Sequence, residues 1–215
     1  DRITNELDTV LHIKASPRGE RSFSAQAGGR FLKRYLELNP DNCLDVLELE
    51  SAVLPEFDSR AVACVEKLRQ GGKLSGELAE HWSAIEAVIT RFKAASRLVI
   101  SCPMWNFSVP YRLKQYLDLI VQAGYTFAYR DGRQVGLVQG RPARLFLARG
   151  GEYGPGSGSE HRDFQQKYLE EILGFIGFTG IRTFLVEPTV RKGPEAASQA
   201  LEIAVRDALL DLNDF

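Results

Sequence analysis

Residues 98–110 read LVISCPMWNFSVP, an apolar run followed by a segment rich in aromatic residues and prolines. The run from Leu98 to Cys102 is nearly continuous in apolar residues, which is typical of a strand that is covered on both faces. The segment 103–110 would then lie at the carboxyl end of this strand. There it forms either a wall for a flat ring, with Asn106 at the ring edge, or a packed hydrophobic turn. Ser108-Val109-Pro110 predicts a helix start, because proline is tolerated in the first turn.

The rest of the chain alternates between strand and helix patterns. Short apolar or β-branched runs predict four more strands, and apolar residues at helical spacing predict the helices between them. Five strands that alternate with helices imply an α/β fold with a doubly wound parallel sheet and helices on both faces. Residues 125–140 predict a hairpin or excursion within a single domain that spans 1–215. The other expected strands are 9–15, 43–49, 145–148 and 183–186, and the expected helices are 23–38, 76–95, 110–121, 160–177 and one from residue 193 onward.

The composition argues against several classes of partner. Lys and Arg total 27 against 28 Asp and Glu, so the net charge of −1 gives no support for nucleic-acid or polybasic membrane binding. No apolar run reaches the roughly 20 residues that a membrane helix needs. The three cysteines are widely spaced and odd in number, which favours reduced thiols. Because residues 1–6 show no signal-peptide pattern, we expect a cytoplasmic protein.

Ligands of open α/β sheets bind at the carboxyl ends of the strands, which directs attention to the loops after the first, third and fourth strands. The first of these loops reads SPRGERSFS over residues 16–24. Its hydroxyls and the helix start that follows suit a phosphate, and helix capping by Ser22 or Ser24 is the alternative. The loop matches neither a Walker A motif nor a dinucleotide fingerprint. The last loop contains Gly150 and Gly151, which allow close approach of a ligand or form an ordinary turn.

These segments together resemble the FMN-dependent azoreductases and NAD(P)H:quinone reductases of the flavodoxin-like superfamily. The resemblance extends from about Val10 to about Pro188, and the PMWNFSVP run is its most specific part. The matching segments are 16–24, 103–110, LKQYLD at 113–118, GYTFAY at 124–129, Gly136-Leu137, Arg149-Gly150-Gly151 and LGFIG at 173–177.

The resemblance implies a five-stranded flavodoxin-like domain that binds FMN without a covalent bond. It also implies a homodimer with both active sites at the subunit interface. Trp105 stands where many relatives have tyrosine, and Tyr153 where several have histidine; both departures concern the substrate side. The implied FMN-binding residues are Ser16, Arg18, Ser22, Phe23 and Ser24 at the phosphate, Pro103, Met104, Trp105, Asn106 and Phe107 along the ring, and Arg149, Gly150, Gly151 and Tyr153 at the pyrimidine side, while Trp105, Tyr129 and Phe175 are the implied substrate-binding residues.

The resulting hypothesis is an oxidoreductase that transfers hydride from NADH or NADPH to quinones and azo compounds by a ping-pong mechanism. FMN carries the chemistry, so no catalytic side chain and no metal are expected. The alternative is a flavodoxin-like electron carrier, but such a carrier would favour a strongly acidic surface. A phosphodiester hydrolase would need a nucleophile or a metal cluster, and neither is visible in the sequence.

The remaining polar residues receive structural interpretations. His12 lies inside the first strand and is expected to be a satisfied core or face residue, whereas His81 is expected on an exposed helix face. The segment 160–163, which includes His161, is more consistent with a solvated, acidic helix N-terminus than with acid–base catalysis or a metal site. Cys102 has no histidine nearby in sequence, so we expect a buried thiol rather than a nucleophile.

Overall fold

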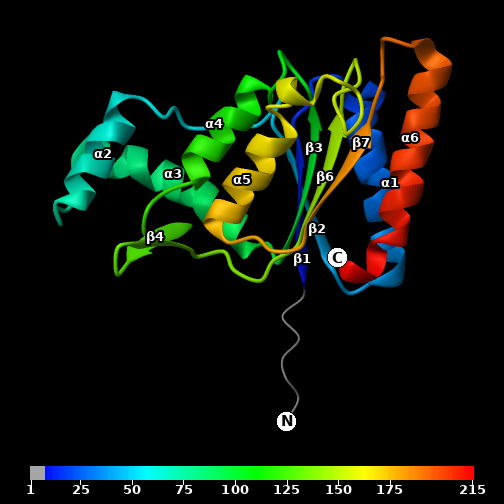
Figure 1. Cartoon of the computed structure of the whole chain (residues 1–215). Helices are drawn as coiled ribbons and strands as arrows, with labels where there is room; N and C mark the ends of the chain where they lie inside the picture. Colours follow the sequence, from blue (N-terminus) through cyan, green and yellow to red (C-terminus); the bar gives the residue numbers. More distant parts are fainter. Residues whose placement is uncertain (1–7) are drawn as a thin grey trace.

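The five predicted strands form one parallel sheet in this computed structural model, which describes residues 8–215 (Figure 1). The sheet order is β2-β1-β3-β6-β7, so the chain moves outward in one direction after β1 and in the other direction from β3 onward. The topological switch point therefore lies between β1 and β3, where ligands of such sheets bind. The strands are β1 (Thr9–Lys14), β2 (Cys43–Glu48), β3 (Arg97–Pro103), β6 (Ala143–Ala148) and β7 (Ile181–Val186).

Helices cover both faces of the sheet, as the sequence predicts. Alternate residues of each strand point to opposite faces, so Leu11 and Ile13 of β1 join one core and Val10 joins the other. The first core includes α4 (Tyr111–Ile120), α5 (Gln166–Ile176) and the end of α3 (Gly76–Ala94), and the second includes α1 (Phe23–Leu38) and α6 (Gly193–Leu210).

One helix has no counterpart among the expected ranges, and another is shorter than expected. α2 (Ser59–Arg69) packs on α3 away from the sheet, and the Asp58 carboxylate accepts the backbone N–H groups of Arg60 and Ala61 at its start. The predicted helix 160–177 is wrong at its beginning, because Glu160–Arg162 form a single 3₁₀ turn and α5 starts only at Gln166. Single 3₁₀ turns also occur at Gly19–Arg21 and Leu212–Asp214.

The excursion predicted at 125–140 is an antiparallel hairpin of β4 (Phe127–Arg130) and β5 (Arg133–Gly136). Asp131 and Gly132 form its two-residue turn with φ values of 51° and 73°, which matches the twist of paired strands. The hairpin lies at the end of the molecule where the sheet strands begin (Figure 1). Across residues 8–215, no helix combines the length and the apolar character that a membrane span requires.

Candidate active site

The loops that follow β1, β3 and β6 meet at the carboxyl end of the sheet, as the sequence predicts for a ligand site. Together with residues after β7 they enclose a cleft of about 310 Å³ at the switch point between β1 and β3. This volume lies at the small end of the roughly 300–1,000 Å³ typical of ligand pockets. The cleft is lined by Ser16, Pro17, Arg18, Ser22, Phe23, Pro103, Met104, Trp105, Ala148, Gly150, Thr189 and Val190.

The loop after β1 both caps the following helix and lines the cleft. The Ser22 hydroxyl caps α1 by accepting the backbone N–H of Ala25 at 3.3 Å, and Ser22 also lines the cleft. Ser24 is fully buried and lies 3.1 Å from Ser22 through the two hydroxyl oxygens, so it supports Ser22 rather than lining the cleft itself. The N-terminus of α1, with its unpaired amides and positive dipole end, points at this loop and favours an anion there.

The loop after β3 is a tight turn over residues 105–108. Trp105 and Ser108 exchange two backbone hydrogen bonds of 2.9 Å, which makes Asn106 and Phe107 the central residues, with φ values of 47° and 70°. The left-handed region is uncommon for asparagine and exceptional for a bulky phenylalanine. Strain of this kind is typical of functional sites. The turn leaves the Trp105 side chain partly exposed, at 41%, at the mouth of the cleft.

The two central residues of this turn lie outside the cleft. Asn106 lines a neighbouring hollow on the surface, which Trp105 shares. Phe107 packs edge-on against Tyr153, with ring centroids 6.0 Å apart, and the Arg162 guanidinium lies 5.8 Å from the Phe107 ring centre. The structure therefore places Met104 and Trp105 in the cleft and uses Phe107 to join this turn to the loop after β6.

In the loop after β6, only the first glycine lines the cleft. The Arg149 side chain is fully buried and points into the protein, where it contacts Asp163, Glu187 and Gln165. Gly151 lies behind, against the ring of Tyr153. The solvated setting predicted for Asp163 is wrong, because its carboxylate is buried against Arg149 and accepts backbone N–H groups at the start of α5.

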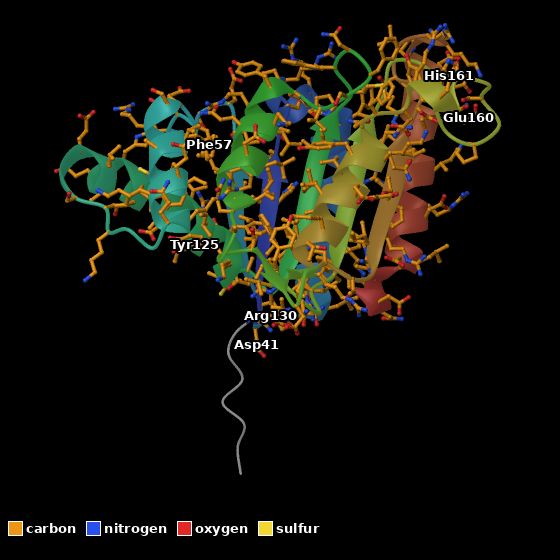
Figure 2. All side chains as sticks on the ribbon, turned by 60° about the vertical axis from the view of Figure 1, so that its left-hand side comes forward. Asp41, Phe57, Tyr125, Arg130, Glu160 and His161 are labelled. Atoms are coloured by element: carbon orange, nitrogen blue, oxygen red, sulfur yellow. The ribbon has the colours of Figure 1, made fainter. Side chains whose placement is uncertain are left out.

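Two predicted substrate-binding residues lie far from the cleft of their own chain. Tyr129 belongs to β4 and is 68% exposed, and Phe175 of α5 packs on Phe127 with ring centroids 4.8 Å apart. Figure 2 shows Arg130, the neighbour of Tyr129, at the end of the molecule opposite Glu160 and His161. These aromatic residues can serve a cleft only if that cleft belongs to another copy of the chain.

The histidines differ in how well their predictions hold. His12 is buried and its Nε2 lies 2.8 Å from the Ser101 hydroxyl, which confirms a satisfied residue in the core. Burial, followed by the charge of Lys14, lowers its pKa to about 3. The exposed position predicted for His81 is wrong, since its side chain is only 9% exposed and contacts Asp58. His161 is exposed. Within residues 8–215, no three His, Cys, Asp or Glu side chains gather closely enough to hold a metal ion.

Comparison with known proteins identifies the family of this chain. Residues 8–210 match the model of a family described as having a flavodoxin-like fold. The chain belongs to this family. It is 48% identical over 207 residues to an FMN-dependent NADH:quinone oxidoreductase of Nitratidesulfovibrio vulgaris, with 94% of this chain and 99% of the relative covered.

Solved structures extend the likeness to three dimensions. An azoreductase from Bacillus anthracis matches with a TM-score of 0.86 and 28% identity, over 97% of this chain and 100% of the other. A Bacillus anthracis FMN-dependent NADH-azoreductase, solved in complex with FMN, has a TM-score of 0.83 at 28% identity, over 94% and 98% of the two chains. The resemblance seen in the residues is thereby confirmed for the family of FMN-dependent azoreductases and quinone reductases.

Proposed function

We propose that the protein is an FMN-dependent oxidoreductase that transfers hydride from NADH or NADPH to quinones and azo compounds. The observation that carries this proposal is one cleft at the switch point that joins a serine loop at a helix N-terminus to a tryptophan-bearing turn. The first feature suits a phosphate and the second suits a flat ring. The relatives named above as FMN-dependent reductases support the same assignment.

The lining of the cleft fits FMN. Ser16, Ser22 and the start of α1 offer hydroxyl and amide donors for a phosphate, and Arg18 adds a positive charge beside them. At the other end, Met104 and Trp105 provide apolar walls. Gly150 presents bare backbone between these walls and Val190 of the loop after β7, so a ring can approach the chain closely. Bound FMN would supply hydride acceptance and donation.

The protein itself would hold the flavin and orient the substrates beside it. The turn at 105–108 holds Trp105 at the cleft mouth, where its exposed face can stack on a flat donor or acceptor. No thiol beside the cleft acts as a nucleophile, because burial raises the pKa of Cys102 to about 12 and keeps it protonated. Since donor and acceptor would occupy the same place in turn, we propose ping-pong kinetics.

We also propose a cytoplasmic homodimer whose active sites lie at the subunit interface, with Tyr129 and Phe175 covering the flavin of the partner subunit. The exposure of Tyr129 at the far end of its own chain supports this arrangement. A hollow of about 610 Å³ beside Trp105 shares Phe57 and Asp118 with another of about 530 Å³ along α2, α4 and α5, so an indented surface continues away from the cleft. Light scattering should give the mass of a dimer, and Tyr129→Ala should lower turnover; a monomer with unchanged turnover would refute the shared site.

The experiment that tests the function is an absorbance spectrum of the protein loaded with FMN, recorded without oxygen as NADH and then NADPH are added. Loss of flavin absorbance, followed by its return on addition of a quinone, supports the reductase. An electron carrier would keep its flavin colour in the presence of either nicotinamide. Parallel lines in double-reciprocal plots would support ping-pong kinetics, and intersecting lines would contradict them.

A further inference from the structure

A buried ion cluster lies beneath the loop that follows β6. The Arg149 guanidinium is 2.8 Å from an Asp163 carboxylate oxygen and 3.4 Å from one of Glu187, and it also donates to Gln165 at 3.1 Å. The exposed fractions of the three charged side chains are 0% for Arg149, 6% for Asp163 and 13% for Glu187. Two carboxylates therefore share one buried cation. Because a buried charge is costly unless it is fully hydrogen-bonded, each carboxylate needs further hydrogen-bond donors.

The two carboxylates find these donors in different places. Asp163 accepts the backbone N–H groups of Gln165 at 3.1 Å and Gln166 at 2.9 Å, so it fixes the start of α5. Glu187 accepts the backbone N–H of Tyr153 at 3.0 Å and of Gly154 at 2.7 Å, so it fixes the loop after β6. The same cation thus anchors two acids that hold two separate pieces of backbone.

Gly154 shows how closely Glu187 approaches the loop. A Cβ added at this glycine would lie 2.6 Å from the Glu187 Oε1 atom and 3.1 Å from Leu185 Cδ1, and the first of these is closer than real contacts allow. A side chain at 154 would therefore displace the carboxylate from the position in which it accepts both amides. The backbone torsion of this glycine is not among the left-handed ones, so the requirement is one of space.

The loop held in this way begins at the cleft. Gly150 lines it, Gly151 lies against the ring of Tyr153, and that ring packs on Phe107 of the turn at 105–108. We propose that Glu187 is a positioning residue, which holds segment 150–154 in the conformation that binds the ring end of FMN. The proposal rests on the function proposed above and adds a residue that does not itself line the cleft.

The cluster offers a matched pair of variants. Glu187→Ala and Asp163→Asn each remove one negative charge from the same buried cation and leave the other acid in place to pair with it. Only the first takes the acceptor away from the amides of Tyr153 and Gly154. Glu187→Gln keeps one acceptor oxygen for these amides, so it should restore part of what alanine loses.

Two measurements read out the position of the loop. Hydrogen exchange of the Tyr153 and Gly154 amides is followed in flavin-free protein, and the FMN dissociation constant is measured by quenching of flavin fluorescence. For Glu187→Ala we expect both amide exchange and the dissociation constant to rise roughly ten- to a hundredfold, because a hydrogen bond to a charged group is lost at each amide. Glu187→Gln should fall between, and Asp163→Asn should leave both quantities unchanged.

Equal FMN affinity in Glu187→Ala and Asp163→Asn would overturn the proposal, as would amides that stay protected in the alanine variant. If Glu187→Ala does not fold, Gly154→Ala makes the same test, because its methyl group forces the carboxylate off the amides while the three charges remain. Failure of the unaltered protein to bind FMN would instead refute the proposed function, and the exchange measurement would still report on the loop.

Discussion

Replacing Gly28 with alanine is expected to destabilise the protein, although alanine is the better helix former. Gly28 lies in the middle of α1, on the face that packs against the sheet. A Cβ added there would lie far inside van der Waals contact of the Ser101 hydroxyl, and 3.2 Å from His12 Nε2 and 3.3 Å from a ring atom of Phe146. The methyl group has to displace the hydroxyl that bonds His12.

The magnitude follows from three opposing contributions. Alanine in place of glycine stabilises a helix interior by about 1 kcal/mol. Overpacking of a full core costs roughly 1–3 kcal/mol. Breaking the buried contact between His12 and Ser101 costs roughly another 1–3 kcal/mol, because both groups lose their partner away from water. The net expectation is a loss of about 1–5 kcal/mol. For a chain of this size, that corresponds to a fall in melting temperature of roughly 2–20 °C.

The neighbouring glycine provides the control. Gly29 lies in the same helix, faces solvent and has nothing within 4 Å of an added Cβ, so Gly29→Ala should stabilise the protein by about 1 kcal/mol. Urea unfolding of both variants without FMN measures the difference, since bound ligand would add its own stabilisation. Gly28→Ala as stable as Gly29→Ala would refute the reasoning. Adding Ser101→Ala to Gly28→Ala should recover part of the loss, because it removes the closest clashing atom.

Three further outcomes are expected. In steady-state assays, Trp105→Ala should lower kcat/KM for quinones about fivefold, because a stacked ring contributes about 1 kcal/mol, while Trp105→Phe should retain most of the activity. Folding lowers the pKa of His12 from 6.5 to about 3, so between these pH values the unfolded chain binds one proton more than the folded protein. The free energy of unfolding should therefore decrease as the pH falls from 6.5 toward 3. Acid unfolding of His12→Gln should show a smaller decrease over this range. Iodoacetamide should label exposed Cys43 in the native protein and spare buried Cys64 and Cys102, as peptide mass mapping can show.

The parts of the fold that could be predicted are those in which local pattern and tertiary structure agree. The run 98–102 is apolar on both faces and forms the central strand β3, and Asp131-Gly132 supplies the turn that a hairpin needs. α2 has only a weak helical pattern in the sequence, because its buried face is narrow and contains only Ala61 and Cys64. Asp58 before it was a start signal that the sequence did contain.

In the candidate site, some features could be predicted from the sequence and others depend on the fold. Residues that line the cleft follow strand ends, so their grouping could be expected from the position of the strands alone. The role of Arg149 could not be predicted, because its partners Asp163 and Glu187 come from other segments of the chain and only the fold brings them together. The same is true of Phe175, because only the fold brings the end of α5 against Phe127 of the hairpin.

These observations connect the rigid interior to the cleft. Two loops at the cleft are supported from behind: the serine loop leads into α1, whose Gly28 packs over His12 and Ser101, and the loop after β6 is hydrogen-bonded to Glu187, which pairs with buried Arg149. The turn at 105–108 is tied to the same frame through the hydrogen bond from Met104 to Ala148 and the packing of Phe107 on Tyr153. The proposed ping-pong scheme, in which donor and acceptor occupy the cleft in turn, would need such support, because the walls would have to keep one shape for two different ligands. Removal of Glu187, which supports the loop after β6 without lining the cleft, should therefore weaken FMN binding.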